Sequence, residues 1–305
     1  MKKLIIMAIT LIMVLSFTAC NGETAEEEEE EIIGEELPSA QEIIDGVTEA
    51  LASTRSYQFD MNMTVDTSGE AEGEAFNMSM DMDGTGAIDL DKKEMMMNMT
   101  MNMVVPGEDE IDMDTAMYLI GDTIYMQMTN PLFGGPPMWM KFEVPEESWG
   151  DMSSQIDQLG LLSEMFEMGE MGEVKVTGSA SVAGIDCYTV EIIPDIEQLW
   201  QLVMEQMQLS EQTTDIPEMT VENFPDILKS YSIKHWVAKD TYHIAKMEMA
   251  MEMQMTPEDM GLPEEEGAVN MKMKMSMLIY DYNQPVNVIL PPEAEDAVEV
   301  PMPEA

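Results

Sequence analysis

Methionine occupies every second position through three long runs of this 305-residue chain. The runs are 97–103, 247–255 and 271–277, and the residues between the methionines are mostly polar. Because successive side chains of a β-strand point to opposite faces, a period of two places all methionines of a run on one face. The runs therefore predict long strands that are apolar on one side and polar on the other.

The same alternation continues outside these runs and predicts about ten long antiparallel strands, some with Ile, Val or Tyr in place of Met. A helix is expected before them over 39–52, where Ser39 and Glu42 have the spacing of a capping box. Gly84 and Gly86, inside one strand pattern, predict a sharp bend or bulge. The expected strands are 57–66, 76–90, 95–105, 111–120, 123–129, 138–142, 173–179, 183–193, 231–238, 242–256 and 268–282.

Helical periodicity interrupts the strands in the middle of the chain. One pattern runs from Met152 to Leu162, a second from Asp195 to Met207, and a third from Val221 to Leu228. A wide apolar sheet face must be covered by helices, by a ligand or by both. The expected fold class is α+β, a curled antiparallel sheet (an incomplete β-barrel) with a helical lid block, as a single domain over 38–290.

The first 19 residues predict a lipoprotein signal peptide, with Lys2 and Lys3 ahead of the apolar segment Leu4–Leu15. The following Phe17–Cys20 resembles the lipobox of prokaryotic lipoproteins, which implies that Cys20 is lipidated and becomes the new N-terminus. Two acyl chains are enough for stable anchoring. The expected location is therefore extracytoplasmic, lipid-anchored to the cell membrane within the cell envelope. An ordinary secretory signal with an incidental Cys20 is the alternative.

Acidic residues outnumber basic residues 61 to 13, which gives a net charge of −48. Such a charge repels nucleic acid and bare anionic membrane, so no nucleic-acid partner is expected. Six consecutive glutamates over 26–31 predict that 20–37 is an extended, disordered acidic tether, with a cation-binding tail as the alternative. Residues 291–305 are rich in Pro and Glu and predict a flexible tail.

Motifs of catalysis are missing from the sequence. The chain has two histidines, His235 and His243, with no Cys or carboxylate at the spacing of a zinc site. It contains no G-x-S-x-G, P-loop or G-x-G-x-x-G motif. The expectation is a protein that is not an enzyme, with no cofactor and no metal centre. Cys187, the one cysteine besides Cys20, is expected to be a small buried hydrophobe.

Three segments resemble a known family. They are the opening helix 39–52 leading into strand Tyr57–Thr67, the segment Tyr118–Tyr125 before Trp139–Lys141, and the strand-and-turn His235–Tyr242. In these segments and their order the chain resembles the lipoprotein carriers of the LolA/LolB type and the related LppX/LprG-type lipoproteins. The resemblance implies an incomplete barrel of antiparallel strands, lidded by helices, around a cavity for acyl chains. The Met content and acidity depart from the family and leave the ligand open.

The methionine faces favour a binding role over simple packing. Burying a Met side chain yields ~1.5–3 kcal/mol, whereas fixing its rotamers costs up to ~2 kcal/mol. A chain that chooses Met repeatedly gives up rigidity for adaptability, as promiscuous apolar binding surfaces do. The expected function is to bind or carry a hydrophobic, lipid-like ligand in a Met-lined cavity. The candidate ligand-binding residues are Met61, Met63, Met80, Met99, Met101, Met249, Met251, Met253, Met273 and Met275.

Two alternatives remain open. The methionines can fill a core without any ligand, which leaves a structural or interaction domain. They can also bind Cu(I), which thioethers favour, or buffer oxidants through reversible sulfoxide formation. Sulfurs along one strand face lie ~6.6–7 Å apart, so a metal site would need sulfurs from neighbouring strands. The expected partners are the membrane, through Cys20, and the apolar ligand, and the protein is expected to be a monomer.

Overall fold

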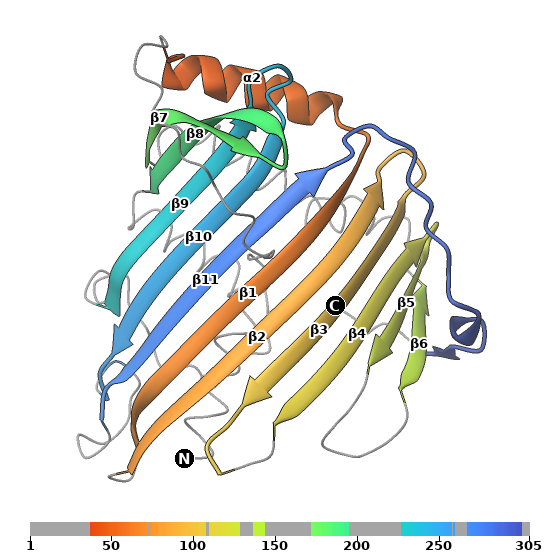
Figure 1. The fold of residues 1–305 in the computed structure, drawn as a ribbon. Coiled ribbons are helices and arrows are strands. Elements are labelled where there is room, and N and C mark those ends of the chain that lie inside the picture. The colour runs from red at the N-terminus through yellow and green to blue at the C-terminus, as the bar shows by residue number, and fades with distance from the viewer. Residues whose placement is uncertain are drawn as a thin grey trace.

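The computed structural model describes residues 37–71, 74–107, 110–128, 137–143, 172–194, 227–257, 259 and 267–300. Within these ranges the chain forms one 12-stranded sheet and a single α-helix (Figure 1). The signal peptide, Cys20 and nearly all of the acidic tether lie outside the described residues. The predicted lid helices also lie outside them, apart from Ile227 and Leu228, and Leu228 begins a strand.

All neighbouring strands are antiparallel except β12 and β6, which pair in parallel. Their order in the sheet is β12-β6-β5-β4-β3-β2-β1-β11-β10-β9-β8-β7. Helix α2 spans Ala40–Ser53. The strands are β1 (Ser56–Ala71), β2 (Glu74–Asp89), β3 (Glu94–Val104), β4 (Ile111–Ile120), β5 (Thr123–Met128), β6 (Met138–Glu143), β7 (Gly172–Val182), β8 (Ile185–Pro194), β9 (Leu228–Ala238), β10 (Ile244–Met255), β11 (Val269–Tyr280) and β12 (Val298–Glu299).

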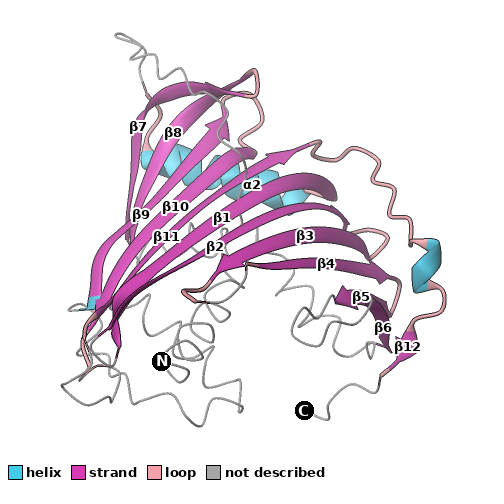
Figure 2. Cartoon of the chain, turned by 60° about the horizontal axis from the view of Figure 1, so that its bottom comes forward, coloured by secondary structure: helices cyan, strands magenta, loops and turns pink. Residues whose placement is uncertain are grey.

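The sheet is neither closed nor strongly curled, so the strong curl expected from the sequence is not found in the described chain (Figure 2). Strands β7 and β12 form opposite edges of the sheet and do not pair with each other. An apolar face does not force closure when another element can cover part of it. The coarser expectation, an antiparallel sheet with alternating faces, is confirmed for β1 to β11.

Helix α2 covers one end of the apolar face of the sheet. The predicted capping box is present, with the Ser39 backbone N–H donating to Glu42 Oε2 at 2.7 Å. The helix buries Ile43 and Val47 completely, and both belong to the same hydrophobic core as Phe59 of β1. The helical stripe read from the sequence is therefore the side of α2 that packs on the sheet.

Strand β2 passes through Gly84 and Gly86 without the expected bend or bulge, because its register with β1 and β3 is unbroken there. Instead, the two glycines leave space for side chains of the neighbouring strand β1. A Cβ atom at Gly84 would lie 2.5 Å from Cγ of Met61, and one at Gly86 would overlap the ring of Phe59. The missing side chains make room for two large ones on β1, so the glycines are packing positions.

The end of the chain packs on the opposite face of the sheet. Beyond residue 290 the described chain contains η2 (Pro292–Ala294) and β12. Ala294 and Ala297 are buried against Tyr118 and Trp139, whose ring centroids are 5.9 Å apart. Small side chains at these two positions fit against the aromatic rings and hold this Pro- and Glu-rich segment on the sheet.

Candidate ligand-binding face

Methionines from neighbouring strands stand directly opposite one another on the apolar face, hereafter the Met face. Met63 on β1 pairs with Met82 on β2 and with Met275 on β11. The methionines of the row through Met63 lie on six strands and are Met113, Met101, Met82, Met63, Met275 and Met249. The next row runs Met103, Met80, Val65, Met273 and Met251. All ten predicted ligand-binding residues thus lie on one face of one sheet.

Burial divides these ten residues into two groups. Met99, Met101 and Met249 are half-buried. The other seven are no more than 8% exposed, and Met63 is fully buried. They are Met61, Met63, Met80, Met251, Met253, Met273 and Met275. Side chains with so little exposed surface are packed core residues, so only the half-buried methionines of this set have substantial surface open to solvent.

The Met face continues beyond β3 onto strands for which the sequence nominated no site residue. Met97 on β3 pairs with Met117 on β4, which pairs with Met126 on β5, which pairs with Met140 on β6. These four are half-buried, and nearby Met138 is 55% exposed. We call this part the accessible Met section; it comprises Met97, Met99, Met117, Met126, Met128, Met138 and Met140. The i,i+2 methionine pairs 126/128 and 138/140 were the available sequence signal.

Tyr231 and His235 are polar side chains within the buried part of the Met face. Tyr231 donates its hydroxyl hydrogen to Sδ of Met249 at 3.2 Å, and burial raises the pKa of Tyr231 to about 12. His235 stands opposite Met247, is fully buried, and has its pKa lowered to about 4 by desolvation. Both groups are therefore neutral at neutral pH, and the buried face carries no charge from either.

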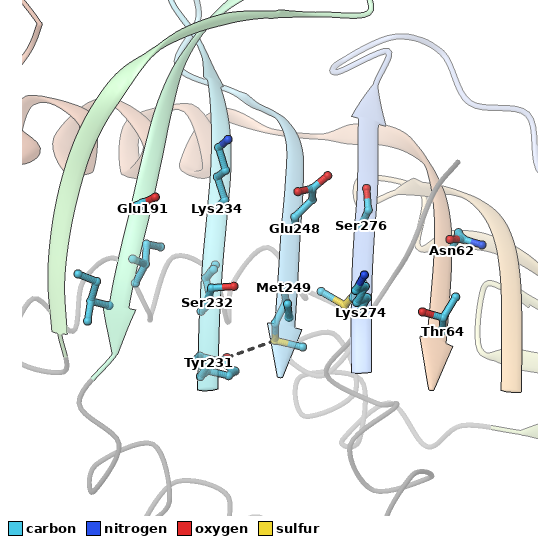
Figure 3. Close-up of a pocket in the computed structure, with 15 residues that line it drawn as sticks. Asn62, Thr64, Glu191, Tyr231, Ser232, Lys234, Glu248, Met249, Lys274 and Ser276 are labelled. Carbon is cyan, nitrogen blue, oxygen red and sulfur yellow. Dashed lines mark hydrogen bonds between the residues drawn. The ribbon is translucent and has the colours of Figure 1, made fainter. Parts of the chain in front are cut away.

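The opposite face of the sheet carries paired charges. A single row crosses seven strands as Lys175, Glu191, Lys234, Glu248, Ser276, Asn62 and Asp83. A cavity of about 720 Å³ lies over the middle of this row, and Glu191, Lys234, Glu248 and Lys274 help to line it (Figure 3). Opposite charges directly across neighbouring strands stabilise their pairing. The alternation of Lys and Glu along this row gives it a role in strand pairing.

One ion pair on this face involves a buried lysine. Lys246 Nζ lies 2.8 Å from Glu248 Oε1 and 4.7 Å from the centroid of the Trp236 ring, and its side chain is only 6% exposed. On the same face, Lys272 Nζ lies 3.2 Å from Glu252 Oε1, but the lysine side chain is 59% exposed. Both pairs join a lysine to a glutamate of β10, but Lys246 is shielded from water and Lys272 is not.

Glu248→Gln is expected to lower the free energy of unfolding by about 1–2 kcal/mol, because it removes a compensating charge from a poorly hydrated ammonium. Glu252→Gln should cost no more than about 0.5 kcal/mol, because water solvates Lys272. Urea unfolding at neutral pH, followed by circular dichroism, measures both values. Equal losses in the two variants would contradict the assignment of different environments to the two lysines.

Other site chemistry is sparse in the described part of the chain. No group of three or more His, Cys, Asp or Glu residues is arranged there to hold a metal ion. No helix in the described ranges combines the length and hydropathy needed to span a membrane. Cys187 is completely buried, as expected, and desolvation raises the pKa of its thiol to about 11. The thiol is therefore protonated at neutral pH, and it is a packing residue.

Comparison with known families gives one clear result. Residues 39–299 match the family model described as "Family of unknown function (DUF6612)". The chain belongs to this family. The match begins at the N-cap residue of α2 and ends in β12, so DUF6612 covers the whole described sheet. The comparison with curated proteins found no match.

This DUF6612 chain is also similar, at low identity, to solved structures of lipoproteins and related proteins. Lipoprotein LppX of Mycobacterium tuberculosis is 13% identical, with 83% of this chain and all of that chain covered, at a TM-score of 0.36. A LolA superfamily protein from Nitrosomonas europaea is 9% identical, with 83% and 96% covered, at a TM-score of 0.21. With both TM-scores below 0.5, neither similarity carries an argument.

Proposed function

We propose that this protein is a membrane-anchored extracytoplasmic lipoprotein, not an enzyme, which binds or carries a hydrophobic, lipid-like ligand on its Met face. The observation that carries the proposal is the accessible Met section. It is an apolar surface that is half-buried instead of closed, and it is continuous with the buried methionine core. Contiguous exposed apolar surface is uncommon on monomeric proteins and marks binding sites for apolar partners.

The side chains of this section suit a ligand of variable shape. Met has three rotatable side-chain bonds and a polarisable thioether, so it adapts to irregular apolar groups. Surfaces built in this way re-pack around different partners, as promiscuous binders do. Acyl chains are flexible and differ in length and unsaturation, and they match this property better than a rigid ligand would.

In this proposal, the anchor holds the protein at the membrane and the negative charge keeps the folded body from adsorbing to it. Lipidation of Cys20 would hold the chain at the membrane, with the acidic segment 20–37 as a spacer. The net charge of −48 opposes close adsorption to anionic headgroups. A tethered body that is repelled from the surface can take up or release an apolar ligand without becoming embedded.

The test is native mass spectrometry of full-length protein purified from its own membrane fraction. Co-purifying acyl lipid is the expected result. Met99→Glu and Met101→Glu should each reduce lipid retention by about tenfold or more, because a carboxylate would have to lose its water to contact acyl chains. Thr100→Glu is the matched control, since Thr100 lies between them in β3 and is exposed on the opposite face.

Unchanged retention in folded Met99→Glu and Met101→Glu proteins would contradict the proposed site. Equal loss in the Thr100→Glu control would show that added charge, and not the Met face, governs retention. Wild-type protein that carries no lipid, or that is missing from the membrane fraction, would contradict carriage or anchoring respectively. Circular dichroism of each variant confirms that the sheet has formed.

A further inference from the structure

The accessible Met section contains four thioethers in one continuous row. Met97, Met117, Met126 and Met140 occupy β3, β4, β5 and β6, and each stands directly opposite the next. A second row beside it contains Met99, Thr115, Met128 and Met138. The section therefore holds seven sulfur atoms on four adjacent strands of a chain whose described histidines both lie elsewhere, in β9 and just before β10.

The row, and not the sequence run, brings sulfurs close together. Methionines two positions apart along a strand are ~6.6–7 Å apart. Directly opposite residues on neighbouring antiparallel strands have Cβ atoms only ~4.5–5.5 Å apart. An unbranched Met side chain can bend toward either neighbour, so three adjacent members of a row can point their sulfurs at one position between them. Met117 and Met126 are the central pair and have a methionine on each side.

Access distinguishes the centre of this row from the centre of the row through Met63. Met117 and Met126 are half-buried, whereas the equivalent central pair Met63 and Met275 is 0% and 5% exposed. An ion from solution can reach the first pair without opening the core. Thioethers are neutral, soft donors that select Cu(I), whereas hard cations such as Ca²⁺ and Mg²⁺ require oxygen ligands. The net charge of −48 attracts cations in general, so the sulfur donors supply the selectivity.

We propose that Met117 and Met126, with Met97 or Met140 as a third ligand, form a binding site for Cu(I). The site uses the same face as the proposed apolar ligand but does not depend on ligand carriage. The ion is bound and released as Cu(I), and no electron is transferred. The buried rows through Met63 and Val65 remain packing residues.

The experiment is an anaerobic titration of the purified full-length protein with Cu(I) in competition with a chromogenic Cu(I) chelator. The double variant Met117→Leu/Met126→Leu removes both sulfurs and keeps the surface apolar with nearly unchanged volume. It should bind Cu(I) about tenfold more weakly or worse, since tenfold corresponds to ~1.4 kcal/mol. The matched control Met63→Leu/Met275→Leu removes an opposed pair from the same face and should leave Cu(I) affinity within about twofold of wild type.

Wild-type affinity in the Met117→Leu/Met126→Leu protein would overturn the site, and so would an equal loss in the control pair. Wild-type protein that takes no Cu(I) from the chelator would also overturn it. The titration measures Cu(I) alone and uses no lipid, so its outcome is independent of the lipid-retention test on Met99 and Met101.

Discussion

Gly86→Ala is expected to lower the free energy of unfolding by about 3 kcal/mol, at the upper end of the usual cost of overpacking a core. A Cβ atom at this position overlaps the Phe59 ring, and Phe59 is itself 5% exposed. The ring cannot turn away easily because it packs in the main core with α2 on the same face. Urea unfolding followed by circular dichroism measures the loss.

A double-mutant cycle tests the cause. Phe59→Leu in the Gly86→Ala background should restore part of the lost stability, with a coupling free energy of about 1 kcal/mol or more, because the smaller side chain leaves room for the new methyl group. Gly178→Ala is the control, since a Cβ there meets no heavy atom within 4 Å. Simple additivity of the Gly86 and Phe59 changes would contradict the proposed steric conflict.

The alternation in the sequence identified faces reliably and pairing partners poorly. Met61, Met249 and Met273 were expected to share a face, and the register confirms it. That β1 pairs with β11, more than 200 residues later, could not be read from the sequence, because every strand has the same period and a similar composition. A repeated pattern predicts which side chains of a strand share a face. It does not predict which strands are neighbours in the sheet.

The curled barrel failed as a prediction for a related reason. Curvature depends on twist, bulges and the pairing of edge strands, and none of these follows from a period of two. Gly84 and Gly86 were interpreted as a bend because a strand glycine often marks one. In the structure the gap above each glycine is filled from β1, by Met61 and Phe59. A sequence shows that a side chain is missing and does not show which neighbour uses the space.

The same limit applies to the candidate site. The alternating pattern predicts that Met63 and Met275 lie on the apolar face. It does not predict that both are buried, since burial depends on what packs above them. The accessible row through Met117 and Met126 gives a weaker signal in the sequence, since β5 is only six residues long and has just two methionines. In a sequence this rich in Met, the short strands at the edge of the sheet are more informative about access than the long central runs.

Acid should weaken the fold through His235, by about 3 kcal/mol between pH 6.5 and pH 4. Burial among apolar side chains lowers the pKa of the folded imidazole from 6.5 to about 4. In that interval the unfolded chain binds a proton at His235 that the folded chain does not bind, so falling pH favours unfolding. The contribution of the neutral imidazole is complete above pH 6.5 and is lost as the pH approaches 4.

The measurement must separate His235 from the 61 acidic side chains, which also take up protons near pH 4. His235→Leu keeps an apolar side chain opposite Met247 and removes the titration. The stability of wild type relative to His235→Leu, measured by urea unfolding at several pH values, should therefore fall by about 3 kcal/mol over this interval. His243→Gln is the comparison variant. Burial also lowers the pKa of His243, but this side chain is only partly buried, so the pH-dependent loss of stability due to His243 should be smaller than that due to His235. A wild-type curve parallel to that of His235→Leu would show that His235 is protonated in the folded chain, which full burial in an apolar core opposes.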